Sequence, residues 1–156
     1  MPDKEGNCMD SVDASQIPGL KLSKNVDITE VYDRLRKKWL VLTPEEGVRQ
    51  YFTSWLIDSK KYPASLMGNE ISLRLNGMLR RCDTLIYDNS LKPIAVVEYK
   101  APDVAISQNV FDQIARYNMV LSARVLIVTN GISHYCCRYS AGGYEFLKEI
   151  PEYRDI

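Results

Sequence analysis

The sequence predicts a mixed α/β domain of the α+β kind, in which an antiparallel meander forms part of a mixed β-sheet flanked by helices. Three observations lead to this fold class. A capped amphipathic helix precedes three strand-like segments joined by tight turns. A second helix separates these segments from another apolar strand. The chain has 156 residues, 46% of them apolar, which is enough for one domain with a substantial core.

The polar start of the chain is expected to lie outside this domain. Residues 1–19 are irregular in pattern and end at Pro18-Gly19, so we interpret them as a flexible tail. We predict a single domain over residues 20–156. Its first part, residues 28–42, mixes apolar and basic residues. The basic cluster there has two interpretations, phosphate contact or an ordinary solvated face.

The first predicted helix begins after Thr43 and continues to about Asp58. Thr43 suits the N-cap, Pro44 suits the first helical position, and Glu46 would complete a capping box. Apolar residues recur at helical spacing, which predicts one stripe packed against a sheet. The stripe consists of Val48, Tyr51, Phe52, Trp55 and Leu56.

Three strands are predicted next. Residues 70–75 alternate as a half-buried strand does, and Asn76-Gly77 is a strong signal for a two-residue hairpin turn. The returning strand covers residues 78–87, and a polar turn at 88–92 leads to a strand that begins at Pro93. Because both turns are short, the three strands should pair as an antiparallel meander.

The rest of the chain predicts one more helix and three more strands. The helix runs from about Ser107 to Leu121. An apolar strand follows at 124–129, then a strand at 132–139 and a short edge strand at 144–147. The order of elements therefore indicates a mixed sheet with helices on its faces.

Charged residues interrupt two of the predicted apolar strands. Asp83 lies in the second strand of the meander, and Glu98 and Lys100 end the third. Residues two apart on a strand share a face, so Glu98 and Lys100 would point together while Tyr99 turns away. If Asp83 lies opposite Glu98, two carboxylates and an ammonium converge, which suits a hard cation such as Mg²⁺. The pattern indicates a metal-dependent phosphodiesterase site; a solvated ion pair is the alternative.

Charge and cysteine content limit the other possibilities. Twenty basic and twenty acidic residues cancel, so any nucleic-acid binding must come from local clusters. Cys8, Cys82, Cys136 and Cys137 lack metal-binding spacing, and we expect reduced thiols in a cytoplasmic protein. We also expect no signal peptide and no membrane span, because no apolar run approaches about 20 residues.

An ordered set of six segments resembles the PD-(D/E)xK nuclease superfamily. More closely, it resembles the N-terminal nuclease domain of type I restriction enzyme R subunits, in a short stand-alone form. The segments are 36–39, 42–50, 81–83, 98–102, 111–118 and 129–131. Asp-x(n)-Glu-x-Lys alone is weakly specific, whereas the ordered set is specific. The chain has no phosphate loop of the Gly-x(4)-Gly-Lys-Ser/Thr type, so we expect it to lack the helicase motor of the R subunit.

The resemblance implies roles for the charged cluster. Asp83 and Glu98 would ligate Mg²⁺ or Mn²⁺, with the main-chain carbonyl of Tyr99 as a further ligand. Lys100 would position the attacking water or stabilise the phosphate in the transition state. Glu46 matches an acidic position that related nucleases direct at the metal, although its capping role would explain it equally well.

The resemblance also implies contacts to DNA. Gln113 and Tyr117 match a motif on the helix after the lysine strand, and their i, i+4 spacing places both on one helix face. Arg80, Arg81 and Arg116 are the candidates for phosphate contacts. Arg49 and Gln50 would face either the site or water.

We therefore predict a Mg²⁺- or Mn²⁺-dependent nuclease that hydrolyses DNA, for which the sequence leaves endonuclease and exonuclease cutting open. Its expected partners are DNA and other restriction-modification subunits, with a homodimer as a further option. The alternative is a non-catalytic nucleic-acid-binding or complex-assembly module that retains the nuclease fold.

Overall fold

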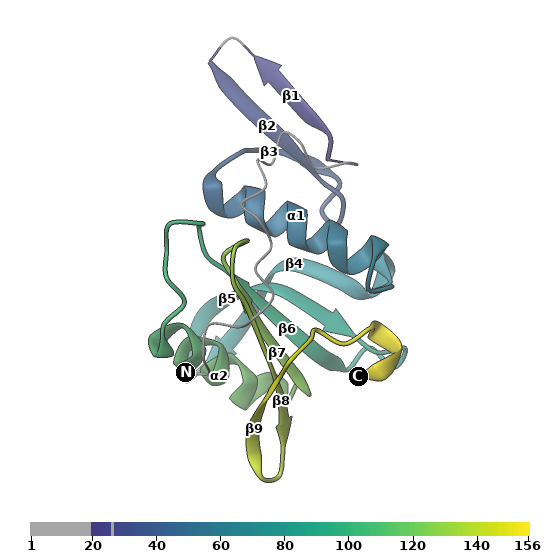
Figure 1. Ribbon diagram of the computed structural model, residues 1–156, viewed down its shortest axis with the longest axis vertical. Coiled ribbons are helices and arrows are strands. Elements are labelled where there is room, and N and C mark those ends of the chain that lie inside the picture. Colours follow the sequence, from purple (N-terminus) through teal and green to yellow (C-terminus); the bar gives the residue numbers. More distant parts are fainter. Residues whose placement is uncertain (1–19, 26) are drawn as a thin grey trace.

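The computed structural model of the chain describes residues 20–25 and 27–156 (Figure 1). The predicted tail at 1–19 lies outside the described residues. Two sheets and two α-helices make up most of the described part. The elements in chain order are β1 (Leu22–Asn25), β2 (Ile28–Asp33), β3 (Lys38–Val41), α1 (Pro44–Asp58), η2 (Ala64–Leu66), β4 (Met67–Leu75), β5 (Met78–Tyr87), β6 (Pro93–Tyr99), α2 (Gln108–Leu121), β7 (Val125–Thr129), β8 (His134–Ser140), β9 (Gly143–Leu147) and η3 (Tyr153–Asp155).

The larger sheet has six strands in the order β4-β5-β6-β7-β8-β9. Strands β4, β5 and β6 form the predicted antiparallel meander. Strand β7 pairs with β6 in parallel, and α2 makes the crossover between them. The sheet is therefore mixed, as predicted.

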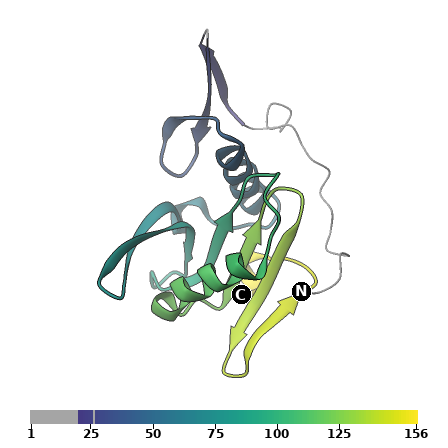
Figure 2. The same cartoon turned by 90° about the vertical axis from the view of Figure 1, so that its left-hand side faces the viewer.

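The two helices cover opposite faces of this sheet, and Figure 2 shows α2 in front of it. On one face, Phe52 of α1 belongs to the same buried cluster as Val97 of β6. On the other face, Ile114 of α2 belongs to a cluster with Val96 of β6. Adjacent residues of β6 thus enter different cores, which explains why this strand is apolar almost throughout.

The first helix begins as predicted but without the expected capping box. Thr43 Oγ1 accepts a hydrogen bond from the Glu46 amide at 3.1 Å, so Thr43 is the N-cap. The Thr43 amide donates to the Val41 carbonyl instead of to the Glu46 side chain. The capping-box prediction for Glu46 is wrong, because arginine side chains engage its carboxylate in charge-assisted hydrogen bonds.

The predicted apolar stripe of α1 is only partly core. Val48, Phe52 and Leu56 are buried, whereas Tyr51 and Trp55 are half-buried. The buried surface of α1 therefore differs from the predicted stripe, because it also includes the polar residues Arg49, Gln50, Thr53 and Ser54.

The hairpin turn between β4 and β5 has the expected geometry. Asn76 and Gly77 have φ values of 49° and 77°, the left-handed pair that a type I′ turn requires. Strand β4 begins earlier than predicted, and its pairing with β5 skips Glu70, which has a φ of 57°. This backbone irregularity lies opposite the part of β5 that carries Asp83.

The sequence reading missed a second sheet. Strands β1, β2 and β3 form an antiparallel sheet in that order. Figure 1 shows this sheet on the side of α1 that faces away from the six-stranded sheet. Most residues of the mixed apolar and basic segment 28–42 therefore belong to strands β2 and β3.

Cys82, Cys136 and Cys137 are unpaired and buried, while Cys8 lies outside the described residues. Cys136 and Cys137 belong to different core clusters, so they point to opposite faces of the sheet as expected.

Within the described residues, no helix combines the length and apolar character needed to cross a membrane.

Candidate active site

Asp83, inside β5, lies beside the charged end of β6, as the sequence predicts. Thr84 pairs with Val97, and one further step in this register places Asp83 beside Glu98. Asp83 Oδ2 also accepts a hydrogen bond from the Tyr99 amide at 2.9 Å. This bond fixes the Asp83 side chain against the end of β6.

Glu98 is almost fully buried, with 4% of its surface exposed. Its Oε1 accepts hydrogen bonds from Lys100 Nζ at 3.4 Å and from Gln113 Nε2 at 3.0 Å. Its Oε2 is buried and has no hydrogen-bond partner among the described residues. Burial and the neighbouring Asp83 carboxylate raise the pKa of Glu98 to about 8. The site therefore holds a carboxyl group whose charge is only partly compensated by Lys100.

Helix α2 contributes the two polar residues that the sequence singled out. Gln113 Nε2 donates to Glu98 and also to Tyr117 Oη at 3.3 Å. Both side chains therefore lie on one face of the helix and reach the same site.

Tyr99 turns away from the carboxylates, as alternation along a strand requires. Its side chain is fully buried, and its hydroxyl lies within hydrogen-bond distance of Thr53 Oγ1 at 3.2 Å and Thr84 Oγ1 at 3.0 Å. Its main-chain amide meanwhile faces Asp83. The residue between Glu98 and Lys100 is thus anchored from behind the site, and metal ligation by its carbonyl stays a prediction.

Arg49 is the buried cation of the site. Its guanidinium pairs with Glu46 at 3.1 Å, with Glu70 at 2.8 Å and with Asp83 at 3.3 Å. The Asp83 contact is to Oδ1, the oxygen that Tyr99 leaves free. The sequence did not decide whether Arg49 and Gln50 face the site or water. Arg49 faces the site, and Gln50 Nε2 donates to Glu46 Oε1 at 2.9 Å.

The carboxylates of α1 have different surroundings. Glu46 is held by Arg36 at 3.0 Å as well as by Arg49. Glu45 lies in the field of the site: burial and the Asp83 carboxylate raise its pKa, and Lys100 and Arg49 oppose this. Sequence reasoning missed Glu45, although it precedes Arg49 by four residues and so shares its helix face.

Glu70 is the other carboxylate that sequence reasoning missed. Burial raises the pKa of Asp83, and the Glu70 charge adds to this shift, while the Tyr99 amide and Arg49 lower it. No sequence signal marks Glu70, because the backbone irregularity in β4 brings it to Arg49.

The donor set fits a hard divalent cation in part. No three His, Cys, Asp or Glu side chains come together as a ready metal site within residues 20–25 and 27–156. Two neighbouring carboxylates with one buried, unpartnered oxygen are nevertheless present. Mg²⁺ is commonly held by one or two carboxylates together with water and substrate phosphate oxygens. Asp83 and Glu98 match that requirement.

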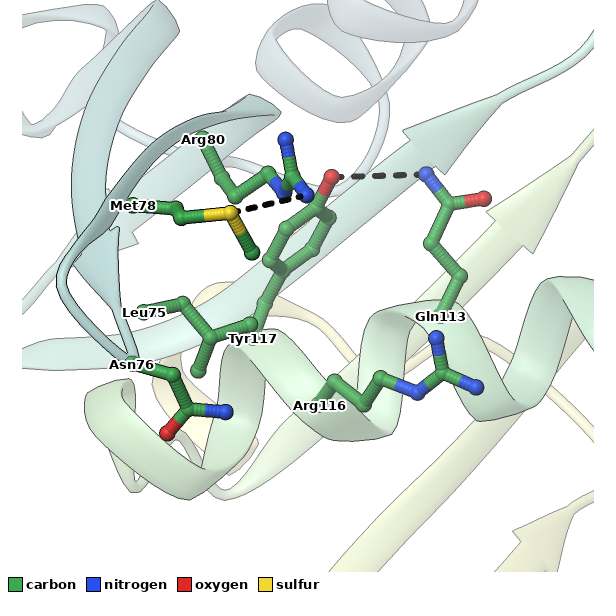
Figure 3. A pocket seen from close by; sticks show the side chains of 7 residues that line it. All are labelled: Leu75, Asn76, Met78, Arg80, Gln113, Arg116 and Tyr117. Atoms are coloured by element: carbon green, nitrogen blue, oxygen red, sulfur yellow. Dashed lines mark hydrogen bonds between the residues drawn. The ribbon is translucent and has the colours of Figure 1, made fainter.

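The predicted phosphate contacts do not all lie together. Arg80 and Arg116 line a cavity of about 460 Å³ between the β4–β5 hairpin and α2, which we call the hairpin–helix hollow (Figure 3). Arg81 pairs with Glu70 at 3.4 Å, outside the residues that line this hollow. Besides these arginines, five residues line it: Leu75, Asn76, Met78, Gln113 and Tyr117.

The two arginines of the basic cluster before α1, Arg34 and Arg36, form ion pairs. Arg36 bridges Asp33 and Glu46, and Arg34 pairs with Asp58 at 3.0 Å. These two residues therefore connect the three-stranded sheet to α1.

Comparison with known proteins agrees with the predicted fold and resemblance. The family model described as "Type I restriction enzyme R protein N terminus (HSDR_N)" matches residues 44–151. A solved structure described as "The fragment structure of a putative HsdR subunit of a type I restriction enzyme from Vibrio vulnificus YJ016" matches with 23% identity and a TM-score of 0.54. The match covers 70% of this chain and 24% of that chain, so this chain spans about a quarter of the solved relative. A search of curated proteins found no match.

Proposed function

Since the chain belongs to the type I restriction enzyme R protein N-terminal family, we propose that it is a metal-dependent nuclease of the PD-(D/E)xK type that hydrolyses phosphodiester bonds in DNA. One observation carries the proposal. The buried Glu98 has an unpartnered carboxylate oxygen beside Asp83, with Lys100 and Gln113 on its other oxygen. A buried carboxylate left in this state costs stability, which is typical of a functional site.

Asp83 and Glu98 would hold the Mg²⁺ or Mn²⁺ ion, and the Tyr99 carbonyl could add a ligand. When bound, such an ion supplies Lewis-acid stabilisation of charge on the phosphate. On α1 we propose Glu45 as the acidic residue that faces the ion, in preference to Glu46. Glu46 is occupied by two arginines, whereas Glu45 is influenced by Asp83 and Lys100.

Lys100 would orient the attacking water or stabilise charge on the phosphate. Its ammonium lies 3.4 Å from Glu98 Oε1, so it stands at the edge of the carboxylate pair. Gln113 holds Glu98 in place and, with Tyr117, would face the DNA strand. Arg80 and Arg116 would contact its phosphates, and we propose endonucleolytic cutting within a restriction-modification assembly.

A second function is favoured by the Arg49–Asp83 ion pair. The Arg49 guanidinium occupies Asp83 Oδ1, one of the oxygens that a metal ion would need. A protein that keeps this pair permanently would bind nucleic acid or assemble with other subunits without cleaving DNA.

A cleavage assay separates the two functions. The purified protein is incubated with supercoiled plasmid and Mg²⁺ or Mn²⁺. We expect cleavage by the wild type and by Lys92→Ala, whose exposed lysine lies in the β5–β6 turn. We expect none by Lys100→Ala or Asp83→Asn. DNA binding without cleavage under either metal would instead support the non-catalytic module.

A further inference from the structure

The hairpin–helix hollow has two kinds of surface. Leu75 and Met78 of the hairpin and the Tyr117 ring supply apolar walls. Arg80 from β5 and Arg116 from α2 supply positive charge. Figure 3 shows the hairpin side chains facing those of α2 across the space. A ligand that fills it must therefore combine an apolar face with negative charge.

The two arginines are free to bind such a ligand. Arg80 donates only a weak hydrogen bond to the Met78 sulfur at 3.9 Å. In the part of the chain that the structure describes, no carboxylate forms an ion pair with Arg80 or Arg116. Guanidinium groups are well suited to phosphate, because their planar donors match its oxygens.

The hollow adjoins the carboxylate pair. Gln113 lines it and at the same time donates to Glu98 and to Tyr117. One side chain therefore separates the space from the site proposed for phosphodiester hydrolysis. A group held in the hollow would lie next to the scissile phosphate.

We propose that the hairpin–helix hollow binds one unpaired nucleotide of a nucleic-acid strand, beside the bond that the carboxylate site would cleave. The statement that the nucleotide lies beside the cleaved bond rests on the proposed function, whereas the binding of a nucleotide in the hollow does not. A nucleotide has a flat apolar base and an anionic phosphate, as the two surfaces require. The cavity of about 460 Å³ is within the range of roughly 300–1,000 Å³ that is usual for ligand sites.

The base must be unpaired because a duplex hides its faces. In a double helix the base faces are stacked and only the edges and phosphates are accessible, so the apolar walls would have nothing to contact. The preferred substrate is therefore a single strand, or a duplex that is open at the cleavage position. Arg80 and Arg116 alone would not distinguish a single strand from a duplex, because both present phosphates.

The test measures binding in EDTA, so cleavage plays no part. Labelled single-stranded DNA and a fully paired, blunt-ended duplex of the same sequence are titrated by fluorescence anisotropy at one fixed salt concentration. We expect the wild type to bind the single strand more tightly. Met78→Ser removes one apolar wall without changing charge and should weaken single-strand binding by about fivefold or more, leaving duplex binding unchanged.

Leu79→Ser is the matched control. Leu79 is the next residue of β5, is 63% exposed and does not line the hollow. It should bind both DNAs as the wild type does, and a deoxynucleoside monophosphate should compete with the single strand for the wild type.

Equal affinity for both DNAs, or a Met78→Ser variant that binds like Leu79→Ser, would overturn the proposal. So would binding of the free nucleotide without binding of the strand. A protein that shows the strand preference but cuts no DNA with Mg²⁺ or Mn²⁺ would keep the nucleotide site and lose the nuclease function.

Discussion

Two buried carboxylates in this molecule have opposite surroundings. Asp33, at the end of β2, is fully buried and accepts hydrogen bonds from the Leu35 and Arg36 amides, both at 2.8 Å, and from Asn69 Nδ2 at 3.1 Å. It also pairs with the Arg36 guanidinium. Glu98, at the end of β6, is nearly as buried but has one oxygen without a partner among the described residues.

The pKa values of the two groups move apart for this reason. Burial by itself raises the pKa of both carboxyls. At Asp33 the hydrogen bonds from Arg36 and Asn69 outweigh burial and lower the pKa. At Glu98 burial and the Asp83 charge dominate, and the pKa rises to about 8. Burial alone therefore does not distinguish the two carboxylates; the incomplete compensation of the Glu98 charge does.

A chain of buried hydrogen bonds connects the two centres. Asn69 donates to Asp33, and Thr84 Oγ1 donates to Asn69 Oδ1 at 2.6 Å. Thr84 Oγ1 in turn lies 3.0 Å from the Tyr99 hydroxyl, behind Glu98 and Lys100. The fully hydrogen-bonded Asp33 is thus connected to β6, the strand that carries the incompletely hydrogen-bonded Glu98.

The largest expected difference between the centres is in catalysis. Glu98→Gln keeps the shape of the side chain but removes its charge, and should lower the single-turnover cleavage rate by about 10²–10³-fold. Asp33→Asn should leave the rate per folded molecule within a few-fold of the wild type. Single-turnover kinetics on plasmid DNA measures both. Similar losses in the two variants would contradict the comparison.

The next effect is on stability. Asp33→Ala leaves two backbone amides, Asn69 and a partly buried Arg36 without their acceptor, and should lower the free energy of unfolding by about 3 kcal/mol at pH 7. The folded pKa of Asp33 lies below 3.8, so this contribution exists above that pH and is lost as the pH falls through the folded pKa. Urea denaturation measures it, with the exposed Asp103→Ala as control. A loss below about 0.5 kcal/mol at pH 7 would contradict the structural role of Asp33.

Glu98 should show the opposite dependence on pH. Its folded pKa of about 8 exceeds the ordinary 4.5, so in EDTA it destabilises the protein increasingly as the pH rises from about 4.5 to about 8. Glu98→Gln should therefore be more stable than the wild type at pH 9, by on the order of 1–2 kcal/mol, and show no gain at pH 4. Denaturation curves at both pH values test this. A variant less stable than the wild type at pH 9 would show that the Glu98 charge is already compensated.

The smallest effect concerns the support behind the site. Thr53→Val removes one partner of the buried Tyr99 hydroxyl and should cost about 1 kcal/mol. Ser54→Ala on the same helix is a matched control, because the Ser54 hydroxyl is buried without a partner among the described residues. Thermal denaturation compares them. Equal effects of the two substitutions would mean that Thr53 contributes nothing through its hydroxyl.

The predictable part of the fold depends on local signals. The Thr43-Pro44 start, the Asn76-Gly77 turn, the alternation in β4 and the apolar runs of β6 and β7 predict the α-helices and strands from α1 to β9 closely. The three-stranded sheet escapes prediction because β1 and β3 have four residues each, and β2 ends in the charged but buried Asp33. Nothing local reveals that Asn69 and Arg36 compensate this charge.

The site likewise has residues that local sequence signals predict and residues that depend on long-range packing. Asp83 and Glu98 are predictable neighbours, because short turns fix the register of adjacent strands. Arg49, Glu45 and Glu70 depend on how α1 is rotated over the sheet and on an irregularity in β4, which are long-range features. The three arginines proposed for phosphate contacts do not lie together. Arg80 and Arg81 are adjacent on a strand and so point to opposite faces of the sheet.

The central claim is that Asp83 and Glu98 together bind a divalent cation. Crystals grown with Mn²⁺ and measured for its anomalous scattering test this directly. We predict a peak within bonding distance of an Asp83 oxygen and of Glu98 Oε2, with the Arg49 guanidinium moved off Asp83 Oδ1. Ordered crystals in millimolar Mn²⁺ with no peak at these oxygens and with Arg49 still paired to Asp83 would contradict it.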